Sequence, residues 1–210
     1  MKHATSVILA LLISTCCLAQ SSRSFDLQQL LKEKKLITFG QKIVPITDDG
    51  KKGISMTSIA WLEGVEFSTG TIEVDLQGKD VFQQSFIGIA FHGVDSVTYD
   101  VVYFRPFNFR AADPVRKIHA VQYATHPEFP WNRLREERNG IYEKAIDPAP
   151  EATSWFHARI LVTNDEITVY VNNSPTPSLK VNKLNSVKSG KIGLFNDGLD
   201  GNFANLVIMK

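Results

Sequence analysis

The sequence has almost no cysteine. Its two cysteines, Cys16 and Cys17, stand side by side near the N-terminus, and none follows them. Disulfides are therefore excluded from the body of the chain, which must be stabilised by its hydrophobic core alone. The same absence removes a cysteine nucleophile from the candidate functions.

An excess of charge is lacking as well. Lysine and arginine total 23 against 22 aspartate and glutamate, which gives a net charge of +1. This balance argues against nucleic acid or an anionic membrane surface as the partner. No segment of the body is long and apolar enough for a membrane helix, so we expect no transmembrane segment. The sequence leaves the oligomeric state open.

Several catalytic and metal-binding motifs are missing. There is no Gly-x-Ser-x-Gly elbow and no glycine-rich phosphate loop. The histidines of the body show no metal-ligand spacing, and they are His92, His119, His126 and His157. We therefore expect no cofactor and no metal. The Asx- and Gly-rich stretch 196–202 could offer oxygens to Ca²⁺, but its spacing is not that of an EF-hand loop, so a plain turn is the simpler interpretation.

The N-terminus has the pattern of an export signal. Lys2 gives a weakly positive start, residues 7–13 are continuously apolar, and small residues precede a cleavage point after Ala19. We predict that 1–19 is a signal peptide and that 20–210 is one domain, exported to the periplasm or the exterior. A lipoprotein is the alternative, because Cys16 follows a short apolar run, although Thr15 is large for the position before a lipidated cysteine.

Most of the body alternates apolar and polar residues with period two. In 71–76, for example, Ile72, Val74 and Leu76 share one face of a strand. Similar runs at about ten to twelve places predict an all-β sandwich of two antiparallel sheets. The one helical pattern lies at 25–35. We predict that the buried residues include Ile72, Val74, Ile87, Ile89, Ile160, Val169 and Leu194.

The segment 105–152 departs from the strand pattern. It contains six of the nine prolines, together with Trp131 and a group of arginines. A polar, proline-rich excursion of this length in a compact domain is more often functional than idle. We expect it to fold back across a sheet.

Several short segments together resemble a known superfamily. They are 68–75 (STGTIEVD), 86–91 (FIGIAF), 103–108 (YFRPFN), 121–123 (VQY), Trp131 with 134–135, 190–195 (GKIGLF) and 201–206 (GNFANL). These resemble the concanavalin A-like lectin/glucanase fold, and within it the bacterial exported 3-keto-disaccharide hydrolase-like domains. The resemblance implies a two-sheet antiparallel jelly-roll sandwich with a carbohydrate-related role on its concave face. Because this fold hosts binding modules and hydrolases alike, it does not decide between them.

Glu73 and Asp75 form the first candidate constellation. Two carboxylates at i and i+2 of a strand face the same way, and retaining glycoside hydrolysis needs such a pair. The glycoside hydrolase family 16 branch of the superfamily has Glu-x-Asp followed by a further Glu, where this sequence has Gln77 and Gly78. The general acid of that mechanism is therefore not matched. An ordinary polar strand face and a sugar-binding role for Glu73 remain open.

The second constellation has the chemistry of sugar recognition. Planar polar side chains bond to hydroxyl edges, while an aromatic ring supports the apolar face of the sugar. We predict a ligand site made of Glu73, Arg105, Asn108, Gln122, Tyr123, Trp131 and Arg135 on one side of the sandwich. The alternative is a structural network that fixes the long segment to the sheet, with Arg105 paired to Glu73 or Asp75.

Three functions follow from these observations. The leading hypothesis is an exported carbohydrate-interacting domain that binds a glycan. The first alternative is an exported hydrolase or lyase that acts on a disaccharide or glycoside, and the second is a structural envelope protein. Whether the protein is an enzyme, and which sugar or linkage it takes, stays open at this stage.

Overall fold

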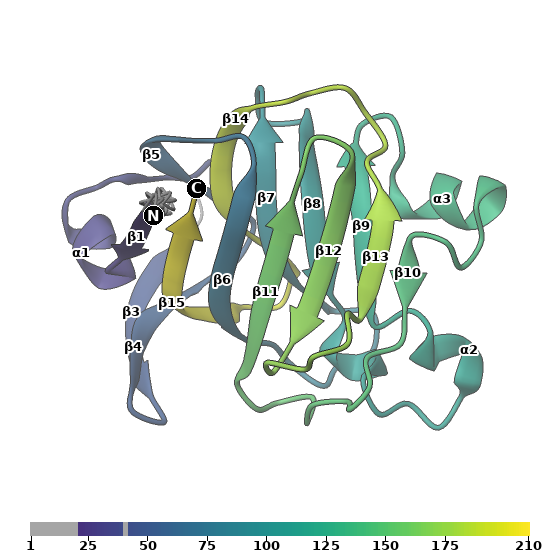
Figure 1. The fold of residues 1–210 in the computed structure, drawn as a ribbon. Helices are drawn as coiled ribbons and strands as arrows, with labels where there is room; N and C mark the ends of the chain where they lie inside the picture. Colours follow the sequence, from purple (N-terminus) through teal and green to yellow (C-terminus); the bar gives the residue numbers. More distant parts are fainter. Residues whose placement is uncertain (1–20, 40–41) are drawn as a thin grey trace, which may run out of the picture.

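The computed structural model describes residues 21–39 and 42–210 as two antiparallel β-sheets packed face to face (Figure 1). The predicted signal peptide, with Cys16, Cys17 and the cleavage point after Ala19, lies outside the described residues. Within them, the prediction of an all-β, two-sheet antiparallel sandwich is confirmed.

One sheet has eight strands among the described residues. They are β1 (Ser22–Phe25), β3 (Ile43–Asp48), β4 (Lys51–Met56), β6 (Gly70–Gln77), β11 (Phe156–Val162), β12 (Glu166–Val171), β13 (Leu179–Asn182) and β15 (Gly201–Met209). Their order is β13-β12-β11-β6-β15-β4-β3, and β1 also pairs with β15.

The other sheet has seven strands in the same part of the chain. They are β2 (Leu36–Ile37), β5 (Ile59–Phe67), β7 (Ser85–Gly93), β8 (Tyr99–Phe104), β9 (Val121–His126), β10 (Glu143–Lys144) and β14 (Gly190–Gly198). Their order is β10-β9-β8-β7-β14-β5-β2. In Figure 1 this sheet lies behind the eight-stranded one.

The helices are short and lie outside the two sheets. They are α1 (Leu27–Lys32), the 3₁₀ turn η1 (Pro106–Asn108), α2 (Pro114–Lys117) and α3 (Trp131–Glu137). The α1 helix forms where the sequence predicted one, because Asp26 caps its first turn by accepting a hydrogen bond from the Gln29 amide at 2.9 Å.

The alternation of the strands places the core as predicted. On β6, Ile72, Val74 and Leu76 are fully buried, whereas Glu73 between them lies on the outer face. All seven residues of the predicted core have no exposed surface, namely Ile72, Val74, Ile87, Ile89, Ile160, Val169 and Leu194. They belong to one hydrophobic cluster between the sheets.

The proline-rich segment 105–152 does more than cross a sheet. It supplies β9 and β10, which extend the seven-stranded sheet at one edge, and α2 and α3 flank that edge at its two ends (Figure 1). The expectation that the segment folds back across a sheet was therefore incomplete, since its residues Val121–His126 form a further strand that is buried along almost its whole length. The helices and turns between these strands bring distant polar side chains to β10.

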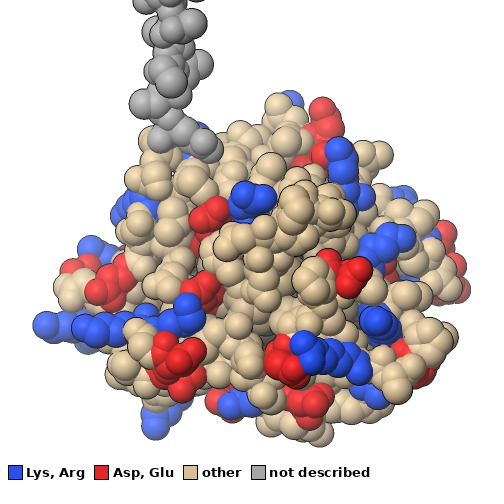
Figure 2. Space-filling model, turned by 60° about the horizontal axis from the view of Figure 1, so that its bottom comes forward, with Lys and Arg blue, Asp and Glu red and all other residues tan. Residues whose placement is uncertain are grey.

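The surface carries mixed charges. On the side drawn in Figure 2, basic and acidic side chains are interspersed, and no large area has one sign. None of the helices in the described part of the chain has the length and apolar content needed to span a bilayer.

A truncation at the centre of the core tests this packing. We expect Ile89→Ala to lower the free energy of unfolding by about 2–5 kcal/mol, because it leaves a cavity among fully buried neighbours. The matched control is Ile141→Ala, at a side chain that is 54% exposed, which should change stability by less than about 0.5 kcal/mol. Urea denaturation followed by circular dichroism measures both, and equal effects would contradict the packing.

Candidate functional site

The outer face of the seven-stranded sheet carries the candidate site. Phe104 of β8 points inward, where its ring meets Phe156 of the other sheet at 5.0 Å. Because side chains alternate along a strand, Tyr103 and Arg105 therefore point outward. Tyr103 lies opposite Gln122 of β9, so these three polar side chains share the outer face near the β10 edge.

Arg105 is buried in a hydrogen-bond network on this face. Its Nη1 donates to the carbonyl oxygen of His119 at 3.0 Å, and its Nη2 donates to the Tyr103 hydroxyl at 2.8 Å. Nη2 also donates to Oε1 of Gln122, which accepts a second bond from the Tyr103 hydroxyl. Gln122 Nε2 has no hydrogen-bond partner among the described residues, which is rare for a buried donor.

Glu143 of β10 joins this network to α3. Its carboxylate accepts from Arg135 Nε at 3.0 Å and Nη2 at 3.1 Å, which is the two-pronged geometry that guanidinium and carboxylate favour. Arg105 Nη1 lies 3.3 Å from the same carboxylate. His119 Nδ1 is 2.8 Å from it, although without the alignment of a hydrogen bond. The Glu143 side chain is 3% exposed, so this charge depends on its basic neighbours.

Burial shifts the pKa values of two groups near Glu143, Tyr103 and His119. For Tyr103, burial is the largest cause of a rise in the pKa to about 12. Burial also lowers the pKa of His119, and the positive charges of Arg135 and Arg105 act in the same direction against Glu143. His119 is therefore neutral at neutral pH, and Tyr103 keeps its proton.

Trp131 begins α3 beside this network. Its side chain is 49% exposed, and the Arg135 guanidinium carbon lies 5.0 Å from the ring centroid. The side chain of Arg135 is 32% exposed and its Nη1 makes no hydrogen bond with the described residues. An exposed indole and a free guanidinium donor therefore lie next to each other, and Glu143 fixes the position of the guanidinium.

Asn108 extends the network toward α2. Its Nδ2 donates to the His119 carbonyl oxygen at 3.2 Å, and its Oδ1 accepts from Arg116 Nε at 3.2 Å. The Arg116 guanidinium carbon lies 4.4 Å from the ring centroid of Phe82, which is 52% exposed. The arrangement of an arginine over an exposed aromatic ring thus occurs twice, once at α2 and once at α3.

A row of aromatic rings covers the sheet beside the polar network. Neighbouring ring centroids lie 5.5 to 6.5 Å apart in the order Phe107, Phe86, Tyr103, Phe195, Tyr99 and Trp61. Phe86 and Tyr99 are half-buried. The outer face therefore offers apolar ring surface next to fixed hydrogen-bond donors.

The structure brings five of the seven predicted site residues into this one network. They are Arg105, Asn108, Gln122, Trp131 and Arg135. The structure does not test their binding of a ligand, which stays a prediction.

Tyr123 does not face the site, so its predicted convergence with Arg105 was wrong. It follows Gln122 on β9, and successive residues of a strand face opposite sides. Its side chain is buried between the sheets, stacked on Phe91 at 6.4 Å, and its hydroxyl donates to Asp100 at 3.0 Å.

Glu73 does not join the site either. It lies on β6, on the outer face of the other sheet, with Oε2 3.9 Å from His157 Nε2. The alternative pairing of Arg105 with Glu73 or Asp75 was wrong for the same reason, because the partner of Arg105 is Glu143. The sequence showed which face of β6 carries the carboxylates but not which sheet β6 belongs to.

Asp75 is the centre of a separate polar cluster on that other sheet. It accepts hydrogen bonds from Lys51 Nζ and Asn205 Nδ2, both at 2.7 Å, and lies 2.8 Å from His157 Nδ1. Burial acts to raise the pKa of Asp75, but the bonds from His157, Lys51 and Asn205 outweigh it and lower the pKa from 3.8 to about 2.

The sequence analysis missed Glu143 as a site residue. It lies in a two-residue strand inside the proline-rich segment, where no alternation marks a face. One signal could have indicated it, because a buried arginine at the end of a core strand needs an acidic partner.

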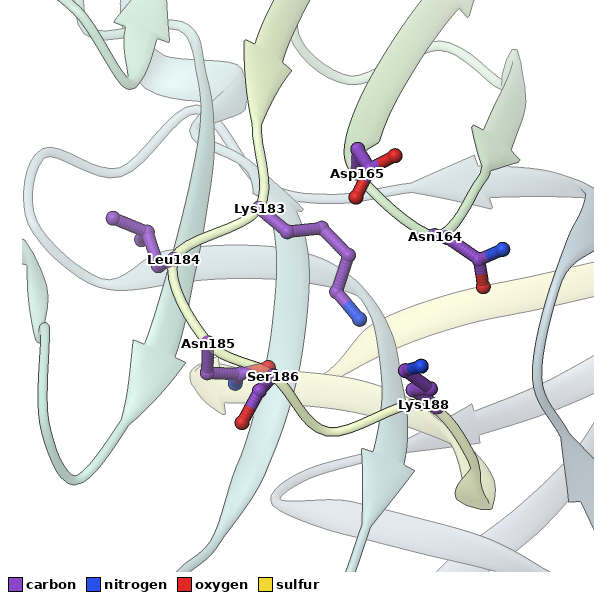
Figure 3. Close-up of a pocket in the computed structure, with 7 residues that line it drawn as sticks. All are labelled: Asn164, Asp165, Lys183, Leu184, Asn185, Ser186 and Lys188. Carbon is purple, nitrogen blue, oxygen red and sulfur yellow. The ribbon is translucent and has the colours of Figure 1, made fainter.

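A hollow of about 640 Å³ lies at the β12–β13 end of the sandwich (Figure 3). It is lined by Asn164, Asp165, Lys183, Leu184, Asn185, Ser186 and Lys188. The Lys183 side chain is almost fully buried, with Nζ 3.9 Å from Asp100 and 3.3 Å from His92 Nδ1, and burial lowers its pKa. Asn185 Nδ2 donates to Asp100 at 2.7 Å, so these polar groups hold the loop that forms the hollow against the sheet.

The 196–202 stretch comprises the end of β14, the two connecting residues Leu199 and Asp200, and the start of β15. Asn196 Nδ2 donates to the carbonyl oxygens of Met56 and Leu199, and Asp200 pairs with Lys79 at 3.3 Å. Across residues 21–39 and 42–210, no three His, Cys, Asp or Glu side chains are grouped as metal ligands. Calcium binding by this turn stays untested.

Comparison with known proteins identifies the fold. No family model matches the sequence, and no curated protein matches it. The structure is similar to a protein of unknown function with a galectin-like fold from Bacillus subtilis, with a TM-score of 0.57 and 12% identity over 89% of this chain and 94% of that one. It also aligns with the carbohydrate-binding module CBM66 from Bacillus subtilis, with a TM-score of 0.49 and 11% identity over 81% of this chain and 92% of that one.

The chain has a galectin-like jelly-roll fold. The predicted resemblance is confirmed at this level, while the narrower likeness to 3-keto-disaccharide hydrolases stays a prediction. At such low identities the likeness shows the fold alone, so function must be argued from the site.

The first prediction for the site concerns Glu143. We expect Glu143→Gln to lower the free energy of unfolding by about 3–5 kcal/mol, because it leaves two guanidiniums without their buried counter-charge. The control is Glu151→Gln, which breaks the exposed pair with Arg110 and should cost less than about 1 kcal/mol. Urea unfolding at neutral pH gives both values, and a Glu143 variant as stable as the control would contradict the network.

The second prediction concerns acid stability. The pKa of Asp75 is lower in the native state than in the unfolded chain, so its contribution is fully present above its ordinary pKa of 3.8 and is lost as pH falls through about 2. We expect the wild type to lose about 2 kcal/mol from this group over that range. In Asp75→Asn this part of the slope should be absent. Unfolding curves from pH 5 to about pH 2 compare the two, and parallel slopes would refute the assignment.

Proposed function

We propose that the protein is an exported carbohydrate-binding domain that takes a saccharide on the outer face of the seven-stranded sheet. One observation carries the proposal, namely the half-exposed Trp131 ring beside Arg135, whose guanidinium is fixed by the buried Glu143. Export follows from the predicted signal peptide and is part of the proposal.

The chemistry of this pair suits a sugar. An indole ring stacks on the apolar C–H face of a pyranose, and a guanidinium held in place donates to ring hydroxyls without a further loss of side-chain freedom. The half-buried rings of Phe86 and Tyr99 offer more apolar surface on the same face. A site with aromatic platforms and a few fixed polar groups is typical of small-ligand recognition.

The state of the carboxylates favours binding over hydrolysis. Glycoside hydrolysis needs a protonated carboxyl group as general acid. Both carboxylate oxygens of Glu143 accept hydrogen bonds from arginines and the side chain is buried, so it offers no free oxygen to a ligand. The pKa of Asp75 on the opposite sheet is lowered to about 2, so this group carries no proton to donate at neutral pH.

The hydrolase alternative has one observation in its favour. Asp197 of β14 is exposed on the same outer face, opposite Phe86 in the sheet. A hydrolase on a disaccharide or glycoside would have to use it with a second carboxyl group. Release of reducing sugar that is lost in Asp197→Asn would establish that alternative over simple binding.

Glycan binding by the protein without residues 1–19 tests the proposal. We expect Trp131→Ala and Arg135→Ala each to weaken binding of the best glycan on an array by about tenfold or more, because each removes a hot-spot type of contact. Isothermal titration calorimetry gives the dissociation constants.

Matched controls exist on the opposite sheet. Trp155 is half-exposed there and bonds to Asp48, and Arg159 packs over Tyr170 at 4.4 Å. Trp155→Ala and Arg159→Ala should bind as the wild type does. If Trp131→Ala binds the glycan as the wild type does, the proposed site is wrong. If no glycan binds the wild type, the proposed function is wrong and the structural envelope role gains support.

A further inference from the structure

We infer that the saccharide bound at this site is acidic, carrying carboxylate or sulfate ester groups that Arg116 and Arg135 recognise. The inference rests on the proposed carbohydrate binding and names the class of ligand. It comes from the repeated arrangement of arginine and exposed aromatic ring at the two ends of the site.

Arg135 is the first of the two recognition groups. Its Nε and Nη2 are occupied by Glu143, while Nη1 has no partner among the described residues. Its side chain is 32% exposed beside the exposed ring of Trp131. The guanidinium is therefore held from behind and presents its free edge beside a surface on which a sugar can stack.

Arg116 repeats this arrangement with different partners. Its Nε donates to Asn108 Oδ1 at 3.2 Å, its Nη2 donates to the Phe107 carbonyl oxygen at 2.7 Å, and the exposed ring of Phe82 lies 4.4 Å away. Both partners are neutral, and none of the ion pairs in residues 21–39 and 42–210 includes Arg116. Its positive charge is therefore uncompensated within the site.

One hydrogen-bond chain connects the two arginines. Asn108 bonds to Arg116 and to the His119 carbonyl oxygen, which also accepts from Arg105. Arg105 then meets Arg135 at the carboxylate of Glu143. The two guanidiniums are thus connected through one hydrogen-bond network, and this connection is the ground for assigning both to one site.

The charge of the site is positive. Arg105 and Arg135 share the single carboxylate of Glu143, and Arg116 pairs with no carboxylate among the described residues. The lowered pKa of His119 keeps that ring neutral. A carboxylate or sulfate group of a ligand would supply the missing counter-charge, with two oxygens that match the planar guanidinium.

Matched pairs of glycans test the inference. The array would carry uronic acid oligosaccharides with their methyl esters, and sulfated oligosaccharides with their desulfated forms. We expect the best ligand to be acidic and its neutralised form to bind at least about tenfold more weakly. Raising the salt concentration should weaken the acidic ligand and leave neutral ones unchanged. The two series show whether carboxylate or sulfate is the preferred group.

Arg116 variants connect the preference to the structure. Arg116→Gln should weaken the acidic ligand about tenfold and reduce its salt dependence, while Arg116→Lys, which keeps the charge without the planar fork, should fall between. Arg159→Gln is the control, because that guanidinium stacks on Tyr170 of the opposite sheet. Thermal unfolding verifies that the variants fold.

The outcomes separate this inference from the proposed function. The inference is refuted if the best ligand is neutral, or if Arg116→Gln keeps wild-type affinity for the acidic ligand. In either case the proposed carbohydrate binding still stands, provided that Trp131→Ala weakens binding of the best ligand. If no glycan of either kind binds, the proposed function fails and the inference falls with it.

Discussion

The buried carboxylate of Glu143 is the interaction on which the candidate site depends. A carboxylate taken out of water needs basic or donor groups close to it, and these come from two places in the chain: Arg105 at the end of β8 and Arg135 of α3. The proline-rich segment is thereby tied to the edge of the seven-stranded sheet. Arg135 owes its fixed position to this pairing, and the Trp131 ring lies against Arg135. A buried ion pair of this kind fixes the positions of the groups around it more than it adds stability. Here the groups whose positions it fixes are those of the candidate site.

Asp75 shows the same physics on the opposite sheet with a different result. It gathers Lys51 from β4, His157 from β11 and Asn205 from β15, so it links its own strand β6 to three other strands of the same sheet. Asn205 reaches it from an irregularity in the pairing of β15 with β6, with a positive φ of 53°. All three of these side chains bond to the carboxylate itself. A buried carboxylate is therefore not by itself evidence of a ligand site; the difference lies in the free guanidinium edges around Glu143.

The sequence could predict what depends on local periodicity. The burial of Ile72 and Val74, the outward direction of Glu73, and the helix near Leu27 all follow from neighbours in the chain. It could not predict which sheet each strand joins, because that depends on pairing between distant segments, and Glu73 was assigned to the wrong side for this reason. Tyr123 is a different case, since strict alternation with Gln122 already excludes a shared face. Glu143 was missed because a two-residue strand gives no pattern.

Adjacent residues of β9 connect the two sides of the seven-stranded sheet. Gln122 reaches outward to Arg105 and Tyr103, whereas Tyr123 reaches inward to Asp100. Asp100 also binds Asn185, which holds the loop lining the hollow of Figure 3. A shift of β9 by one residue would turn the amide into the core and the phenol outward, and both polar networks would lose their partners at once. The register of this strand is thus specified from both faces, so the geometry of the outer site is coupled to a buried cluster that no ligand on the outer face would touch.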